Sequence, residues 1–175
     1  GDVDWAAYAR RNPGGFHGPE HHWRIHNTCF ALVGGGETTL VDCGVGAGPY
    51  PWYAGLRCEL PASLDAAGMA AADFDRVFLT HAHPDHVGWT FDEERREPRF
   101  PNARYVLHRR DRDEFAWRQP VPKHFTRFVE PLERAGVLDL IEGEREISPG
   151  VTAIETPGHT PGHMSLLVRS HGEGL

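Results

Sequence analysis

The segment Thr-His-Ala-His-Pro-Asp-His at residues 80–86 places three imidazoles and one carboxylate within six residues. A second cluster, Gly-His-Thr-Pro-Gly-His at residues 158–163, supplies two further histidines. Zinc and similar ions take imidazole nitrogens and carboxylate oxygens from proteins, and a catalytic site uses about three such ligands while leaving a position for water. We therefore expect a fold that brings these two distant segments together around a bound metal.

The residues around the first cluster predict how it is arranged. Residues 76–80 are apolar and β-prone, which indicates a short buried strand that ends at the cluster. Side chains two positions apart in extended backbone point the same way, so His81 and His83 can bind one ion. Pro84 suits a turn or the first position of a helix, so the two residues after it should face elsewhere. A second ion fits there, and two ions about 3.5 to 4 Å apart are a known hydrolytic arrangement.

The two clusters resemble the pattern of the metallo-β-lactamase superfamily of hydrolases. His-x-His-x-Asp-His and the later Thr-Pro-Gly-His-Thr-Pro-Gly-His carry the likeness, and Leu-Val-Asp-Cys-Gly at residues 40–44 matches a third element. The resemblance covers about residues 26–168. It implies an α+β fold, an αββα sandwich of two mixed β-sheets flanked by helices.

The resemblance also implies roles for single residues. Asp42 would support the metal-binding loop through hydrogen bonds, and His163 would do likewise, because metal-binding histidines need oriented partners. On residue type alone, the alternatives are that Asp42 is an ordinary turn residue at a strand end and that His163 is a structural histidine. Zinc is the expected metal, with two ions bound, and iron or manganese also accept these donors. The implied ligands are His81, His83 and His159 for one ion, and Asp85 and His86 for the other.

The chemistry that such a site predicts is hydrolysis of a small-molecule substrate by a metal-bound hydroxide. Asp85 is the candidate catalytic residue, as a proton shuttle. The continuation Asp-His-Val-Gly-Trp at 85–89, Phe-Pro-Asn-Ala at 100–103 and Glu-Thr-Pro at 155–157 look like the lactonase and organophosphate-hydrolase branch of the superfamily. That branch opens lactones and cleaves aryl esters or phosphotriesters. A serine nucleophile in a Gly-x-Ser-x-Gly motif is absent from the sequence.

Two other functions stay open at this point. Relatives of this fold can hold iron, so an iron-dependent persulfide dioxygenase is one alternative; flavin-linked oxygen reductases typically have glutamate where His83 stands. A noncatalytic metal-binding member is the other. The family places a bridging aspartate and a last histidine after the strand that follows His163, and we expect both beyond residue 175. Residues 1–175 are thus expected to be a single domain, the N-terminal portion of a longer chain, with residues 1–25 as an arm or loop.

Composition limits the kinds of molecule that this protein is expected to bind and where it is expected to be located. The formal net charge of −7 argues against nucleic acid, which favours a basic surface. No apolar run approaches the roughly 20 residues of a membrane span. Three cysteines share no Cys-x-x-Cys spacing, which favours buried thiols and a reducing, cytoplasmic location. The apolar N-terminal arm suggests a homodimer.

Glycine, proline and apolar patterns predict the remaining elements. Four aromatic residues, Trp89, Phe91, Trp117 and Phe125, would either line a substrate pocket or pack in the core. The predicted elements are a hairpin of residues 28–33 and 38–42, a helix over 60–68, a strand over 104–107, helices over 111–118 and 125–135, and strands over 151–155 and 164–168.

Overall fold

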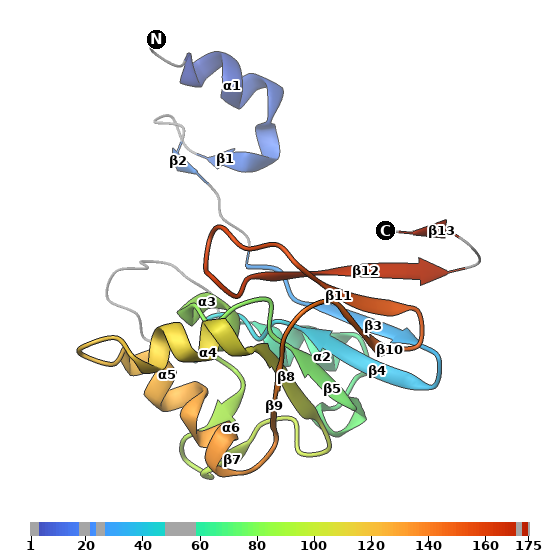
Figure 1. Cartoon of the computed structure of the whole chain (residues 1–175). Helices are drawn as coiled ribbons and strands as arrows, with labels where there is room; N and C mark the ends of the chain where they lie inside the picture. Colours follow the sequence, from blue (N-terminus) through green and yellow to red (C-terminus); the bar gives the residue numbers. More distant parts are fainter. Residues whose placement is uncertain (1–3, 18–21, 24–26, 48–58, 171–172, 175) are drawn as a thin grey trace.

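The protein contains two stacked sheets with helices on one side (Figure 1). The computed structural model describes residues 4–17, 22–23, 27–47, 59–170 and 173–174. The first sheet is mixed: its first two strands form an antiparallel hairpin, and the other neighbours run parallel. Its strands, in order across the sheet, are β3 (Phe30–Gly34), β4 (Glu37–Val41), β5 (Arg76–Phe78), β8 (Arg104–His108) and β9 (Leu138–Ile141).

The second sheet is antiparallel over its described strands. β11 and β12 form its longest pairing, from Val151 opposite Val168 to Glu155 opposite Met164. The connection between these two strands carries the second histidine cluster, so the pairing holds both ends of that loop. The strands, in order across the sheet, are β10 (Arg145–Ser148), β11 (Val151–Glu155), β12 (Met164–Ser170) and β13 (Glu173–Gly174).

The side chains of successive strand residues point to opposite faces of the first sheet and pack in two different hydrophobic cores. Val77 of β5 packs in a core shared with the helices, whereas its neighbour Phe78 packs in a core between the two sheets. Tyr105 and Val106 of β8 divide in the same way, because successive strand residues point to opposite faces. The helices that cover the first sheet are α2 (Leu60–Ala66), α3 (Pro84–Val87), α4 (Arg109–Ala116), α5 (Lys123–Phe128) and α6 (Glu130–Arg134).

The core between the sheets is built from strand residues. Its buried members include Val41, Phe78 and Val106 from the first sheet, and Ala153 and Met164 from the second. Within the described residues, no helix contributes a buried apolar side chain to this cluster. The described chain therefore forms one helical layer and both sheets of the predicted sandwich.

Two glycines explain the β3–β4 hairpin. Gly34 pairs with Glu37, which leaves Gly35 and Gly36 as a two-residue turn with φ of 61° and 81°. Positive φ at both turn positions suits the right-handed twist of a hairpin, and glycine adopts it without strain. The predicted hairpin is confirmed.

The helical pattern predicted over 125–135 is wrong in one respect, because the structure breaks it into α5 and α6. Pro131 lies in the first turn of α6, and proline cannot continue a preceding helix because it lacks an amide hydrogen and its ring meets the carbonyl four residues earlier. The strands β9 and β10 were not predicted either; both are short and carry charged residues, so their alternation is weak.

The N-terminal segment stands apart from the two sheets in Figure 1. No helix in the described ranges has the length and hydropathy needed to cross a bilayer. The elements of the N-terminal segment are α1 (Trp5–Arg11), a 3-10 turn η1 (Pro13–Gly15), β1 (Phe16–His17) and β2 (His22–Trp23), and the short connecting elements elsewhere are η2 (Ala71–Asp73), β6 (Phe91–Asp92) and β7 (Glu97–Pro98).

Candidate metal centre

The first histidine cluster lies at the carboxyl edge of the parallel strands. β4 and β5 run parallel with Val41 opposite Phe78, so Asp42 and Thr80 follow at the same edge. Asp42 Oδ1 accepts a hydrogen bond from the Thr80 amide at 2.8 Å, and the Thr80 hydroxyl donates to the same carboxylate. Asp42 has a φ of 59°, a left-handed conformation that aspartate tolerates better than most residues. These contacts fix the start of the loop that carries the histidines, and the role of Asp42 in supporting a bound metal stays a prediction.

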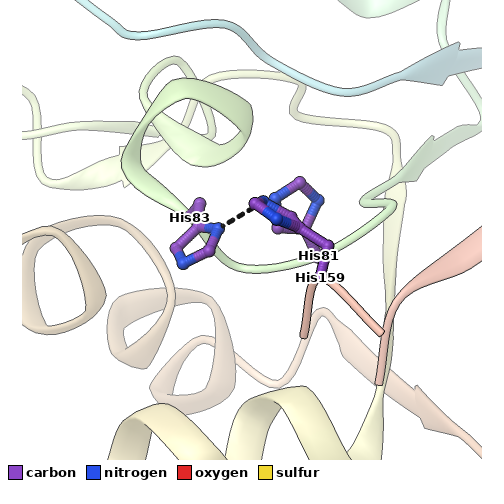
Figure 2. A group of neighbouring side chains, drawn as sticks. All are labelled: His81, His83 and His159. Carbon is purple, nitrogen blue, oxygen red and sulfur yellow. Dashed lines mark hydrogen bonds between the residues drawn. The ribbon is translucent and has the colours of Figure 1, made fainter. Parts of the chain in front are cut away.

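Three histidines from the two clusters converge (Figure 2). Each of His81, His83 and His159 offers one ring nitrogen to a group whose ligand atoms all lie within 4.8 Å of one another. His83 Nδ1 and His159 Nε2 lie 3.0 Å apart. His81 is only 2% exposed, and its Nε2 has no hydrogen-bond partner. A buried ring nitrogen without a partner is costly in a protein interior, and a metal ion would satisfy it.

The protonation of these rings suits a metal. Burial lowers the pKa of His81 to about 3, with further lowering from the nearby rings of His86 and His83. Burial also lowers the pKa of His83, and His159 adds to that effect. A histidine must be neutral to offer its lone pair to a metal. At neutral pH, His81 and His83 therefore present lone pairs rather than positive charge, and the donor set fits a divalent cation.

Asp85 and His86 lie on α3, which begins at Pro84 as the sequence predicts. His86 contacts two carboxylates: its Nδ1 lies 2.8 Å from Asp42 Oδ2, and its Nε2 lies 3.4 Å from Asp85 Oδ2. Burial alone would lower the pKa of His86, but the hydrogen bonds to Asp42 and Asp85 raise it to about 9. The hydrogen bond from His86 lowers the pKa of Asp85 to about 2. The pair is thus an imidazolium held between two carboxylates, and its role as the ligand pair of a second ion stays a prediction.

His163 lies beside the three-histidine group. Its ring centre is 5.1 Å from that of His81, and its Nδ1 lies 2.9 Å from the Thr156 hydroxyl. Thr156 in turn contacts Ser165 at 3.0 Å. Among the described residues, these contacts tie His163 to the ends of β11 and β12, and its role in supporting the metal-binding loop stays a prediction.

Sequence reasoning missed two buried residues of this region. Asp111 is fully buried in the first turn of α4, where the sequence suggested only a helix start. His108 caps the same helix, and its Nε2 lies 2.8 Å from Glu155 Oε1 at the end of β11. An acidic residue in a first helical turn is common in any helix, so nothing in the sequence distinguished Asp111.

The four aromatic residues do not line one pocket. Phe125 is 1% exposed in the core beside Phe115, whereas Trp117 is 73% exposed. Trp89 borders a cavity of about 90 Å³ and carries the Arg99 guanidinium 4.5 Å above its ring. The cavity is lined by Leu60, Pro61, Leu64, Asp65, Met69, Ala71, Trp89, Arg99 and Phe100.

Comparison with known proteins gives one family. The chain matches the model of the metallo-beta-lactamase superfamily over residues 23–172. An N-acyl homoserine lactonase from Bacillus cereus is 29% identical over 112 residues, which are 64% of this chain and 40% of that protein.

Solved structures share the fold. AidC, a dizinc quorum-quenching lactonase in complex with a product, has a TM-score of 0.67 and 23% identity, over 83% of this chain and 53% of that one. A probable metal-dependent hydrolase from Staphylococcus aureus has a TM-score of 0.77 and 20% identity, over 99% of this chain and 64% of that one. These likenesses confirm the predicted fold class. The chain spans less than two thirds of the length of each of these three proteins.

Proposed function

Because the chain belongs to the metallo-beta-lactamase superfamily, we propose that it is a metal-dependent hydrolase whose metal is held by His81, His83 and His159. The observation that carries the proposal is the convergence of three imidazole rings from two distant loops, with the buried His81 Nε2 unpartnered. In a metal-binding histidine one ring nitrogen faces the ion, and the unpartnered Nε2 of His81 is free to do so.

The donor set favours zinc, since nitrogen-rich sites with few carboxylates suit it. Bound there, the metal would act as a Lewis acid and lower the pKa of water from about 15.7 toward about 7. Asp85 and His86 are the proposed ligands of a second zinc. Asp42 would keep its contact with His86 Nδ1, which leaves Nε2 as the nitrogen that turns to the ion.

Asp85 is proposed to move the proton in the reaction. Its pKa of about 2 reflects the hydrogen bond from protonated His86, and loss of that proton when His86 binds a metal would raise it, so that the carboxylate could take a proton from water and then pass it to the leaving group. Its side chain is about one third exposed, so solvent and substrate reach it.

We propose a lactone as the substrate class, ahead of aryl esters and phosphotriesters. The lactonase from Bacillus cereus and the fold likeness to AidC support this choice, as do the segments 85–89, 100–103 and 155–157 that resemble the lactonase branch. A lactone and an ester share the carbonyl that an activated water attacks, so the same residues would serve both.

A substrate panel tests the proposal. The protein would be purified without added metal and reconstituted separately with zinc, manganese or iron. It would then be assayed on acyl lactones, aryl esters and phosphotriesters by pH-detected proton release. We expect zinc-dependent lactone opening that His83→Ala abolishes. Equal turnover in His83→Ala, or oxygen consumption with iron and no hydrolysis with any metal, would overturn it.

A further inference from the structure

Asp111 joins the two histidine loops without belonging to either. Its carboxylate is fully buried and accepts two backbone hydrogen bonds. Asp111 Oδ2 accepts from the Ala82 amide at 2.7 Å, and Oδ1 accepts from the Gly162 amide at 2.9 Å. Ala82 and Gly162 lie in different loops and on different sides of Asp111 in the sequence, so one side chain spans both loops.

The positions of the two amides matter for the ligands. Ala82 stands between His81 and His83, so its peptide sets the path of the backbone between two ligands of one proposed ion. Gly162 closes the loop that begins at His159 and leads into β12. Each hydrogen bond that Asp111 accepts therefore fixes a segment that carries a ligand, and the shared carboxylate fixes the distance between the two segments.

The second loop approaches α4 so closely that only glycine fits. A Cβ atom added at Gly162 would lie 2.5 Å from the Asp111 amide nitrogen and 2.9 Å from His108 Nδ1. Real Cβ contacts are not this short, so a side chain here would push the loop off the helix. The absence of a side chain brings the Gly162 amide within reach of the carboxylate.

Among the described residues, the ring nitrogens of His83 and His159 also approach to 3.0 Å across this junction, but that contact joins side chains and fixes no backbone. The Met164 amide donates to the Thr80 carbonyl at 2.9 Å, and His108 contacts Glu155 at 2.8 Å. Neither link reaches the backbone between ligand histidines. Asp111 is buried and accepts from two amides, so removing its carboxylate would leave two buried N–H groups without an acceptor.

We propose that Asp111 is a positioning residue that sets the spacing of the His81–His83 loop and the His159 loop, and thereby controls the affinity for the metal without contacting it. The proposal deepens the proposed function and rests on it for the identity of the ligands. Hydrogen-bonded partners of this kind typically account for about 10- to 100-fold of metal affinity.

Three variants test it: Asp111→Ala, Asp111→Asn and the control Asp113→Asn. Asn keeps one acceptor oxygen, so it should hold one amide and lose the other. Asp113 lies two residues along the same helix, and its carboxylate pairs with Arg112 and not with the loops. Zinc affinity would be measured by competition with a chromophoric chelator, and hydrogen exchange would be measured on the metal-free proteins.

We expect zinc affinity to fall about 10- to 100-fold in Asp111→Ala and less in Asp111→Asn. In both variants, residues 80–86 and 158–163 should exchange faster together, while the five-stranded sheet keeps its protection. Asp113→Asn should match the wild type in both measurements. If Asp111→Ala fails to fold, Asp111→Asn provides the same readouts.

The outcomes separate this proposal from the proposed function. If the wild type binds zinc and Asp111→Asn binds it equally well in folded protein, the positioning role is wrong. Faster exchange throughout the protein, with unchanged affinity in the folded fraction, also contradicts it, because that is the result of a merely structural residue. If the wild type binds no zinc, the proposed function fails, and coupled exchange of the two loops would still show that Asp111 sets their spacing.

Discussion

The two halves of the candidate site share one loop and yet differ in charge. His81 and His83 are neutral rings with depressed pKa values, and they face His159 from the other loop. His86, a few residues farther on, is protonated and lies between two carboxylates. The same residue type is therefore ready to bind a metal in one half, while in the other half it must first lose a proton.

The difference in pKa arises from the groups that surround each ring. His81 is buried and lies among other imidazole rings, and both conditions disfavour a positive charge on its own ring. His86 turns toward Asp42 at the end of β4, which favours the charge. We infer that the three-histidine group takes up the first metal, and that the Asp85–His86 pair binds a second only as its internal ion pair is replaced.

His159→Ala is expected to have the largest effect, because it removes the only ligand of the three-histidine group that comes from the second loop. Zinc affinity should fall by more than about 100-fold, beyond the loss typical of a supporting residue. Isothermal titration on metal-free protein measures it. His163→Ala, in the same loop, is the matched control and should lose less than about 10-fold. If both variants lose the same zinc affinity, His159 is not distinguished from His163 as a metal ligand.

Asp42→Asn should have an intermediate effect on zinc affinity, and it should act through His86 in the Asp85–His86 half of the site. Asparagine tolerates the positive φ at this position, so the backbone is retained while the charge is removed. The pKa of His86 should fall from about 9, because one of the two carboxylates that raise it is gone. NMR titration of the His86 ring in metal-free protein measures the shift, and zinc affinity should fall about 10- to 100-fold. If the pKa of His86 does not change, Asp85 alone stabilises the positive charge on His86, and the prediction is wrong.

The smallest effect is expected from replacing His124, a half-buried neutral histidine next to the site. Burial lowers its pKa to about 4 from the ordinary 6.5, and its Nε2 has no hydrogen-bond partner. Between pH 6.5 and 4 the unfolded chain therefore binds a proton that the folded chain does not, so stability falls as the pH is lowered through this window. His124→Phe, which keeps an aromatic ring against Phe115, should reduce this loss in urea unfolding at pH 7 and pH 4.5. If the wild type and His124→Phe lose the same stability between pH 7 and pH 4.5, His124 does not cause the pH dependence.

The sequence predicted the parts of the site that depend on local pattern. The strand before His81 and the helix start at Pro84 are short-range features, and the structure confirms both. The Gly35–Gly36 turn is another, since only its own two residues need positive φ.

Other features depend on contacts between distant segments, and the sequence could not supply them. Asp111 accepts hydrogen bonds from backbone amides 29 and 51 residues away. Almost every residue has a backbone amide, so the residue types at those positions do not reveal the contact. The charge on His86 likewise depends on Asp42, 44 residues earlier. Residue spacing shows which side chains could bind a metal, whereas their protonation follows only from the packed structure.

The central claim is that one cation binds among three rings from two loops. Anomalous diffraction at the zinc absorption edge, on crystals grown with zinc, tests it most directly. We predict a peak within bonding distance, about 2.0 to 2.1 Å, of one nitrogen each from His81, His83 and His159. A peak at Asp85 and His86 alone, or no peak in this loop region at saturating zinc, would contradict the account.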